Sequence, residues 1–176
     1  MANSEPSTFR YFAYGSNMSS VRLLTRIPSA RSMGIAQVRG YRLVFDKISK
    51  KDGSGKADCE RTDDADSVVF GVLFQIDMQH KQALDAAEGR GLGYESVDVD
   101  VTTADGIVLA TTYLATRKNP ELRPYSWYLH HVLTGAAEFD LPRAYVEKIA
   151  VVESDVDPNR EREELELDIY SRTKAS

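Results

Sequence analysis

Hydrophobic and polar residues alternate along several stretches of the chain, in the pattern typical of half-buried β-strands. Residues 94–102 place valines between aspartates, and residues 67–76, SVVFGVLFQI, form a β-branched and aromatic run that indicates a central strand. Gly71 inside that run predicts a bulge or a close backbone approach. An Ala-Asp-Gly turn at residues 104–106 predicts a hairpin. The predicted extended segments are residues 9–14, 34–48, 57–61, 67–76, 94–102 and 107–116.

Helices are predicted where apolar residues recur at helical spacing between recognisable start and stop signals. Ser19 or Ser20 would cap the first helix, and Asp77 would cap a helix that closes at Glu88. Pro142 suits a helix start. The predicted helices cover residues 20–27, 78–87, 125–137 and 143–152.

Strands precede residue 116 and helices follow it, an order that favours an α+β domain over an alternating parallel α/β fold. With 176 residues the chain is predicted to form one domain over residues 9–152. Residues 1–8 are predicted to be a disordered tail, and residues 153–176 a charged C-terminal extension. Within this extension, the alternation at 165–169 fits an edge strand or a frayed helix equally well.

Composition narrows the classes of partner. The net charge of −5 argues against nucleic acid, because binding to its backbone requires a basic face. No apolar run approaches the roughly 20 residues that span a bilayer, and the polar start of the chain is unlike a secretory signal. A single cysteine, Cys59, excludes an intrachain disulfide. The chain is therefore predicted to be cytoplasmic, without a membrane or nucleic-acid partner; the pattern leaves a homodimer open.

Candidate chemistry begins at residues 11–17, YFAYGSN, where a buried strand ends abruptly in Gly15, Ser16 and Asn17. These three residue types together mark a turn. Backbone N–H groups in such a turn can bind a carboxylate or stabilise a developing oxyanion. The strand is thus predicted to carry an anion-binding loop to a fixed place.

Other sites are less well supported. A nucleophilic Ser16 would need a histidine base, and nothing in the pattern pairs it with His80, His130 or His131. No histidine or cysteine spacing suits a metal, and Cys59 is expected to be packed. One of His130 and His131 is expected to face inward and the other solvent. The glycines at 89–93 follow a helix, whereas nucleotide-binding glycines open one.

Glu88 is the acid of interest because it ends a predicted helix, where the helix dipole disfavours a negative charge. A carboxyl group that readily takes up a proton suits general acid–base catalysis near neutral pH. From the residues alone, a solvated surface glutamate is the favoured interpretation.

A resemblance to a known family changes this balance. YFAYGSN at 11–17, VFGVLF at 69–74 and LDAAEG at 84–89, followed by Tyr94 and a valine-rich strand, resemble the γ-glutamylcyclotransferases in the same order. The resemblance covers roughly residues 9–150 and implies a small mixed β-barrel flanked by helices.

The resemblance implies an enzyme that releases 5-oxoproline from γ-glutamyl amides, because the substrate's own α-amine attacks its γ-carbonyl. Glu88 would act as general base and then general acid, and Tyr14, Gly15, Ser16 and Asn17 would bind the glutamyl group. Tyr94 and Tyr125 are candidate substrate-binding residues, with Tyr128 as a further pocket wall. No cofactor or metal is implied.

The leaving group stays open. The polar segment 50–66 makes the pocket rim unusual. Amino acids, amines, isopeptides and glutathione all remain candidates, and the motifs most resemble the branch that acts on γ-glutamyl-amino acids. A non-catalytic binding module on the same fold is the alternative.

Overall fold

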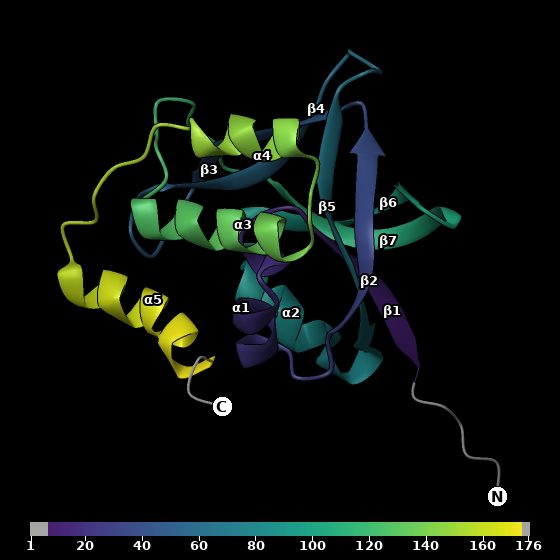
Figure 1. Cartoon of the computed structure of the whole chain (residues 1–176), viewed down its shortest axis with the longest axis horizontal. Coiled ribbons are helices and arrows are strands. Elements are labelled where there is room, and N and C mark those ends of the chain that lie inside the picture. Colours follow the sequence, from purple (N-terminus) through teal and green to yellow (C-terminus); the bar gives the residue numbers. More distant parts are fainter. Residues whose placement is uncertain (1–6, 174–176) are drawn as a thin grey trace, which may run out of the picture.

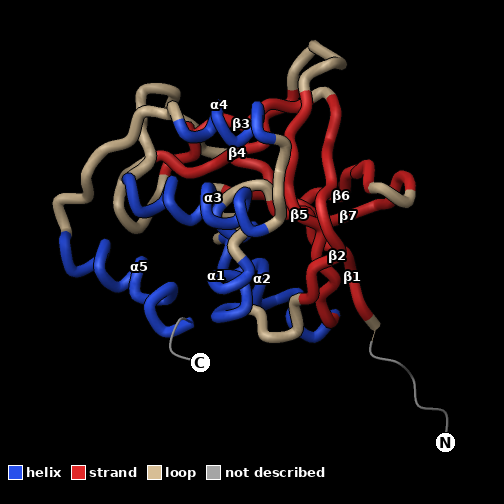
Figure 2. The backbone as a smooth tube through the Cα atoms, in the orientation of Figure 1, coloured by secondary structure: helices blue, strands red, loops and turns tan. Residues whose placement is uncertain are grey.

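Five of the seven strands in the described part of the chain close into a small barrel, in the order β1–β5–β2–β6–β7. The computed structural model describes residues 7–173. Strand β1 pairs parallel with β7, whereas the other neighbouring strands run antiparallel (Figure 2). The barrel is therefore mixed, as the family resemblance implied. Its strands are β1 (Thr8–Ala13), β2 (Arg31–Arg39), β5 (Val68–Asp77), β6 (Tyr94–Thr103) and β7 (Gly106–Ala115).

The other two strands, β3 (Tyr41–Ile48) and β4 (Gly55–Arg61), form a separate antiparallel sheet. Gly40, with a φ of 76°, divides β2 from β3, so the extended segment predicted at 34–48 is two strands. The loop between β3 and β4 is shorter than predicted because Ser49 pairs with Ser54 across it. Strand β4 is held to the barrel by Asp58, whose Oδ1 accepts a hydrogen bond from the backbone N of Ala115 in β7 at 2.8 Å.

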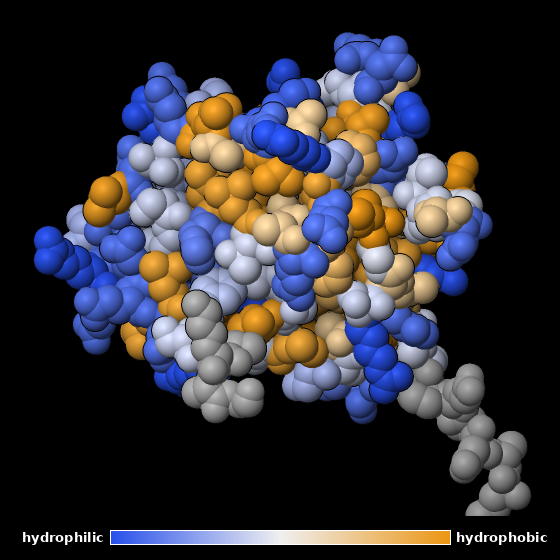
Figure 3. Space-filling model, in the orientation of Figure 1, coloured by the Kyte–Doolittle hydropathy of each residue, from blue (hydrophilic) through white to orange (hydrophobic). Residues whose placement is uncertain are grey.

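The helices lie on two sides of the barrel in Figure 1. Helices α3 (Ser126–Glu138), α4 (Arg143–Ala150) and α5 (Arg160–Thr173) gather beside it, and α1 (Ser20–Arg26) and α2 (Lys81–Glu88) lie toward its lower end. Short 3₁₀ turns, η1 (Ser16–Met18) and η2 (Met78–His80), precede α1 and α2. Figure 3 shows apolar side chains in the middle of this face, over α3 and α4. None of the helices within residues 7–173 has the length and apolar character that crossing a membrane requires.

Several helix boundaries refine the predictions. Ser19 caps α1, because its Oγ accepts a hydrogen bond from the backbone N of Arg22. The predicted cap at Asp77 is wrong: its side chain makes no capping bond, and η2 intervenes before α2. The alternation at 165–169 belongs to helix α5, not to an edge strand. Thr8 already lies in β1, and residues 1–6 of the predicted tail lie outside the described residues.

Close backbone packing holds the barrel to the turn that follows β1. A Cβ at Gly71 of β5 would stand 2.3 Å from the carbonyl oxygen of Ala13, which confirms the predicted close approach. A Cβ at Gly135 of α3 would stand 2.4 Å from the backbone of Met18 and Ser19. Because neither position has room for a side chain, strand, turn and helix pack directly against one another.

A buried polar network docks α5 onto α1 and α3. Arg22 of α1 pairs with Glu166 of α5 and donates to Nε2 of His131, 3.1 Å away. The hydroxyl of Tyr170 lies 2.6 Å from Nδ1 of the same ring. His131 is fully buried, which lowers its pKa to about 4, whereas His130 is exposed. The expectation of one inward and one solvated histidine is therefore confirmed.

The packing of α3 predicts the sign of a stability change. Helix propensity alone would make Gly135→Ala stabilising by about 1 kcal/mol, but the added methyl group would meet backbone atoms. We expect a net loss of roughly 1–3 kcal/mol in the free energy of unfolding, measured by urea denaturation. Ala137→Gly, at an exposed position of the same helix, serves as the propensity control. A Gly135→Ala protein more stable than wild type would contradict this packing.

The His131 network predicts a pH dependence of stability. The pKa of His131 is about 4 in the folded chain and near 6.5 in the unfolded chain, so the unfolded chain takes up a proton first as the pH falls. Stability should therefore be lost between about pH 6.5 and pH 4, with a loss of about 1–2 kcal/mol from pH 7 to pH 5. Urea denaturation of His131→Gln should show a smaller loss over this range. Equal losses in both proteins would contradict the assignment.

Candidate active site

The turn that follows β1 reaches the end of the barrel next to β4 and α3. Tyr14 is buried, and its hydroxyl donates to the backbone oxygen of Tyr113 in β7. A Cβ at Gly15 would stand 3.0 Å from the Cβ of Ala57 and 3.3 Å from the hydroxyl of Tyr128. The first N–H groups of the following turn, η1, have no acceptor within a helix. The sequence-predicted loop is therefore a tight turn with backbone donors.

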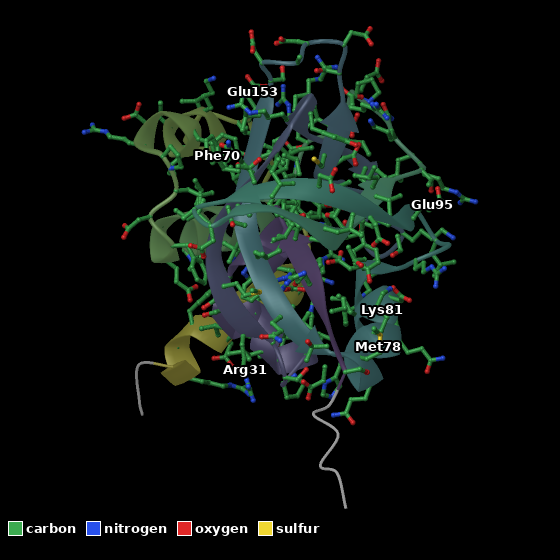
Figure 4. All side chains as sticks on the ribbon, turned by 90° about the vertical axis from the view of Figure 1, so that its right-hand side faces the viewer. Arg31, Phe70, Met78, Lys81, Glu95 and Glu153 are labelled. Carbon is green, nitrogen blue, oxygen red and sulfur yellow. The ribbon has the colours of Figure 1, made fainter. Side chains whose placement is uncertain are left out.

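Glu88 reaches this turn because α2 ends there. Gly89 adopts the left-handed conformation (φ 69°) that commonly ends helices. Figure 4 shows Met78 and Lys81 at the η2–α2 segment, below Glu95 of β6. Asp85 anchors α2 to the barrel, since it accepts a hydrogen bond from the hydroxyl of Tyr113 in β7 at 2.6 Å. The last residue of α2 is thereby fixed beside the barrel.

Two donors hold the Glu88 carboxylate. Oε1 accepts a hydrogen bond from the hydroxyl of Tyr11 at 2.5 Å and another from Nδ2 of Asn17 at 2.7 Å. Burial, followed by the negative charge of Glu88, raises the pKa of Tyr11 well above its usual value, so Tyr11 remains a donor. Arg26 in turn donates to Oδ1 of Asn17 at 3.3 Å, which orients the amide with its nitrogen toward Glu88. Both hydrogen bonds end on Oε1, so neither of them occupies Oε2.

A small cavity joins these groups. It has a volume of about 30 Å³, room for about two water molecules. Tyr94 and Tyr128 bracket Ala57 within it: the hydroxyl of Tyr94 donates to the Ala57 oxygen, and that of Tyr128 accepts from the Ala57 nitrogen at 3.1 Å. Glycine and alanine at 15 and 57 leave this space open. The cavity is lined by Tyr11, Tyr14, Gly15, Ser16, Asn17, Ala57, Glu88, Tyr94, Tyr113 and Tyr128.

The structure brings together most of the residues singled out in the sequence. Residues 14–17, Glu88 and Tyr94 line the cavity, and so does Tyr128. Tyr125 does not line it: its hydroxyl donates to the backbone oxygen of Asp52 at 3.3 Å. Tyr125 precedes Tyr128 by about one helical turn, which moves it along the α3 axis and away from Ala57.

Sequence reasoning missed three lining residues. Tyr11 belongs to the YFAYGSN motif, but an aromatic residue in an apolar strand is typical of any hydrophobic core. The same holds for Tyr113 in β7. Ala57 carries no chemical group that a motif search would notice. Their roles follow from strand register and from the approach of β4, which only the fold reveals.

The structure gives Ser16 no histidine base within residues 7–173. His80 contacts Oγ of Ser29, His131 belongs to the α5 network, and the ring of His130 packs on Tyr170. Cys59 is buried, as expected, and burial raises the pKa of its thiol. Among the residues that line the cavity, Glu88 is the one that carries a carboxyl group.

Larger grooves occur elsewhere on the protein. One of about 520 Å³ lies between α4 and strands β3 and β5, and its walls include Tyr41, Phe70 and Tyr145. We place the candidate site in the smaller cavity because it joins a hydrogen-bonded carboxylate to a turn with backbone donors.

Fold and site together define a small mixed-barrel protein with a single-carboxylate site at one end of the barrel. The chain matches a model of the AIG2-like family over residues 68–149. It is 33% identical to the γ-glutamylcyclotransferase of Mus musculus over 159 residues, which cover 86% of this chain and 82% of the mouse protein. The human γ-glutamylcyclotransferase is 31% identical over 169 residues, covering 92% and 88% of the two chains.

A solved structure of a γ-glutamyl cyclotransferase agrees with this assignment. It matches with a TM-score of 0.81 and 26% sequence identity, over 97% of this chain and 100% of that one. The chain therefore belongs to the γ-glutamylcyclotransferase family, which confirms the resemblance carried by the motifs.

The contact between Tyr11 and Glu88 can be measured with a double-mutant cycle. We expect Tyr11→Phe and Glu88→Ala to couple by roughly 1–3 kcal/mol in the free energy of unfolding, because the hydrogen bond joins a buried hydroxyl to a charged group. Tyr11→Phe combined with Glu95→Ala, at an exposed position of β6, is the control pair. A coupling energy near zero for Tyr11 and Glu88 would show that the two groups do not interact in solution.

Proposed function

We propose that this protein is a γ-glutamylcyclotransferase that converts γ-glutamyl-amino acids to 5-oxoproline and the free amino acid. The observation that carries the proposal is the Glu88 carboxylate, held by Tyr11 and Asn17 beside the Gly15–Ser16 turn. Family membership supports the same chemistry, since the mouse and human relatives carry that name. The cavity holds only about two waters in this structure, so the glutamyl group must displace them and widen it.

Glu88 first acts as a general base. Its Oε2, which faces no donor from Tyr11 or Asn17, takes a proton from the α-ammonium of the substrate. The neutral amine attacks the γ-carbonyl carbon, and a five-membered ring closes as the carbonyl oxygen becomes anionic. Tyr11 and Asn17 keep the carboxylate in one orientation throughout, which favours a short and direct proton transfer.

The turn after β1 and Glu88 complete the reaction. Backbone N–H groups of the Gly15–Asn17 turn would stabilise the oxyanion, a type of interaction whose loss typically costs roughly 10²–10³ in rate. Glu88 then donates its proton to the amide nitrogen as the C–N bond breaks, and the second proton that the ring nitrogen loses passes through the same carboxylate to the leaving amine, which departs as an ammonium group. The carbonyl reforms in 5-oxoproline, and the amine leaves without a water molecule entering the products.

Two further features belong to the proposal. We place the reaction in the cytoplasm, supported by a cysteine that is unpaired and buried. Amines, isopeptides and glutathione are alternative leaving groups, and a homodimer remains a prediction.

Release of 5-oxoproline from γ-glutamyl-alanine tests the proposed function. Glu88→Gln keeps the shape of the side chain but cannot accept the proton, so we expect activity to fall by roughly 10²–10⁴-fold in a protein that still unfolds cooperatively in urea. Glu95→Gln, on the exposed face of β6, is the matched control and should retain activity. Full activity in Glu88→Gln would contradict the proton-transfer role. Binding of γ-glutamyl-alanine without any 5-oxoproline release by wild type would instead favour a binding module.

A further inference from the structure

Lys47 is a mostly buried lysine that forms no ion pair within residues 7–173. Only 9% of the surface of Lys47 is exposed to solvent. Comparable lysines nearby are paired: Lys56 lies 2.9 Å from Asp52, and Lys118 lies 2.8 Å from Asp58. Removing an ammonium group from water without a partner is unfavourable, and burial accordingly lowers the pKa of Lys47. An uncompensated charge of this kind suits a site that takes an anion from outside the chain.

Lys47 stands next to the candidate active site. Its Nζ lies 4.6 Å from the ring centroid of Tyr94, a cation–π contact, and Tyr94 lines the cavity beside Glu88. Its stem passes Gly93, where a Cβ would stand 2.9 Å from Cε of Lys47. Gly93 also has a φ of 138°, which residues with a side chain rarely adopt. Both the backbone angle and the contact with Lys47 therefore exclude a side chain at this position. The chain thus keeps a path open for the lysine toward the cavity rim.

Carboxylates and lysines on neighbouring segments both act on the charge of Lys47. Among the charges acting on Lys47, that of Glu88 raises its pKa most strongly, followed by that of Asp52, while Lys50 and Lys51 act in the opposite sense. Both neighbouring lysines are exposed on the loop that leads to β4. Lys47 is the buried one of these three lysines, and its contact with the Tyr94 ring holds the ammonium group without neutralising it.

The substrate of the proposed reaction has two carboxylates, one on the glutamyl group and one on the amino acid that leaves. The glutamyl amine must meet Glu88, so the leaving group points out of the cavity toward its rim. We propose that Lys47 binds the carboxylate of the leaving amino acid and thereby selects γ-glutamyl-amino acids over γ-glutamylamines. This assignment rests on the proposed function, and it names the residue that sets the substrate class.

Binding measured without turnover tests the assignment. In the Glu88→Gln background, calorimetry compares γ-glutamyl-alanine with γ-glutamyl-ethylamine, which has the same glutamyl group and no second carboxylate. We expect γ-glutamyl-alanine to bind about 10- to 100-fold more tightly, the typical effect of a charge-assisted hydrogen bond. Adding Lys47→Gln should remove this ratio by weakening γ-glutamyl-alanine alone, and Lys47→Arg should restore part of it. Lys51→Gln removes an equal charge from the exposed loop and should keep the ratio.

Three outcomes would overturn the role of Lys47. Equal weakening of both ligands by Lys47→Gln would show that the ammonium holds the glutamyl carboxylate instead. If Lys47→Gln left the affinity ratio of the two ligands unchanged, Lys47 would have no role in choosing between them. The same would follow if neither ligand bound to the Glu88→Gln protein that keeps Lys47. Lys47→Gln should not lower the urea midpoint, because it removes an unpaired charge. Wild-type turnover is measured separately: failure to release 5-oxoproline contradicts the proposed function, while the affinity ratio decides on Lys47 in either case.

Discussion

Direct backbone packing around the turn after β1 is the constraint on which the site depends. Gly71 of β5 lies against the carbonyl of Ala13, and Gly135 of α3 lies against the backbone of Met18. Gly15, between them, approaches Ala57 of β4. Because these contacts involve no flexible side chains, barrel, turn and helix can adopt only one spacing. A rigid turn is what a reaction with precise geometric demands requires.

This rigid frame fixes the position of the Glu88 carboxylate. An acid at the end of a short helix would ordinarily be solvated, yet here the barrel supplies a tyrosine and the turn an asparagine. Arg26 holds that asparagine from the other side. Tyr11, Asn17 and Arg26, which are close together in the sequence, therefore fix a carboxylate that belongs to a distant helix. This arrangement supports the proposed role of Glu88, in which one acidic group both accepts and returns a proton.

The sequence was informative where local rules decide the structure. Alternation located β3 and β6, apolar and β-branched runs located β1 and β5, and the Glu88–Gly89 step ended α2 as helix-capping rules predict. It was uninformative where distant segments meet: closure of β1 on β7, the separate β3–β4 sheet and the contact of Tyr11 with Glu88 all depend on register. The barrel was expected only through the family resemblance. Tyr125 was predicted beside the other pocket residues but does not line the cavity, because one helical turn decides which tyrosine reaches it and no local pattern encodes that choice.

Intramolecular attack by the substrate amine is the central claim, and the fate of oxygen atoms tests it most directly. Wild-type protein would be incubated with γ-glutamyl-alanine in water labelled with heavy oxygen, and the products analysed by mass spectrometry. We predict equal amounts of 5-oxoproline and alanine, both without label, because no water enters the reaction. Glutamate that carries the label would show hydrolysis instead and would contradict the account.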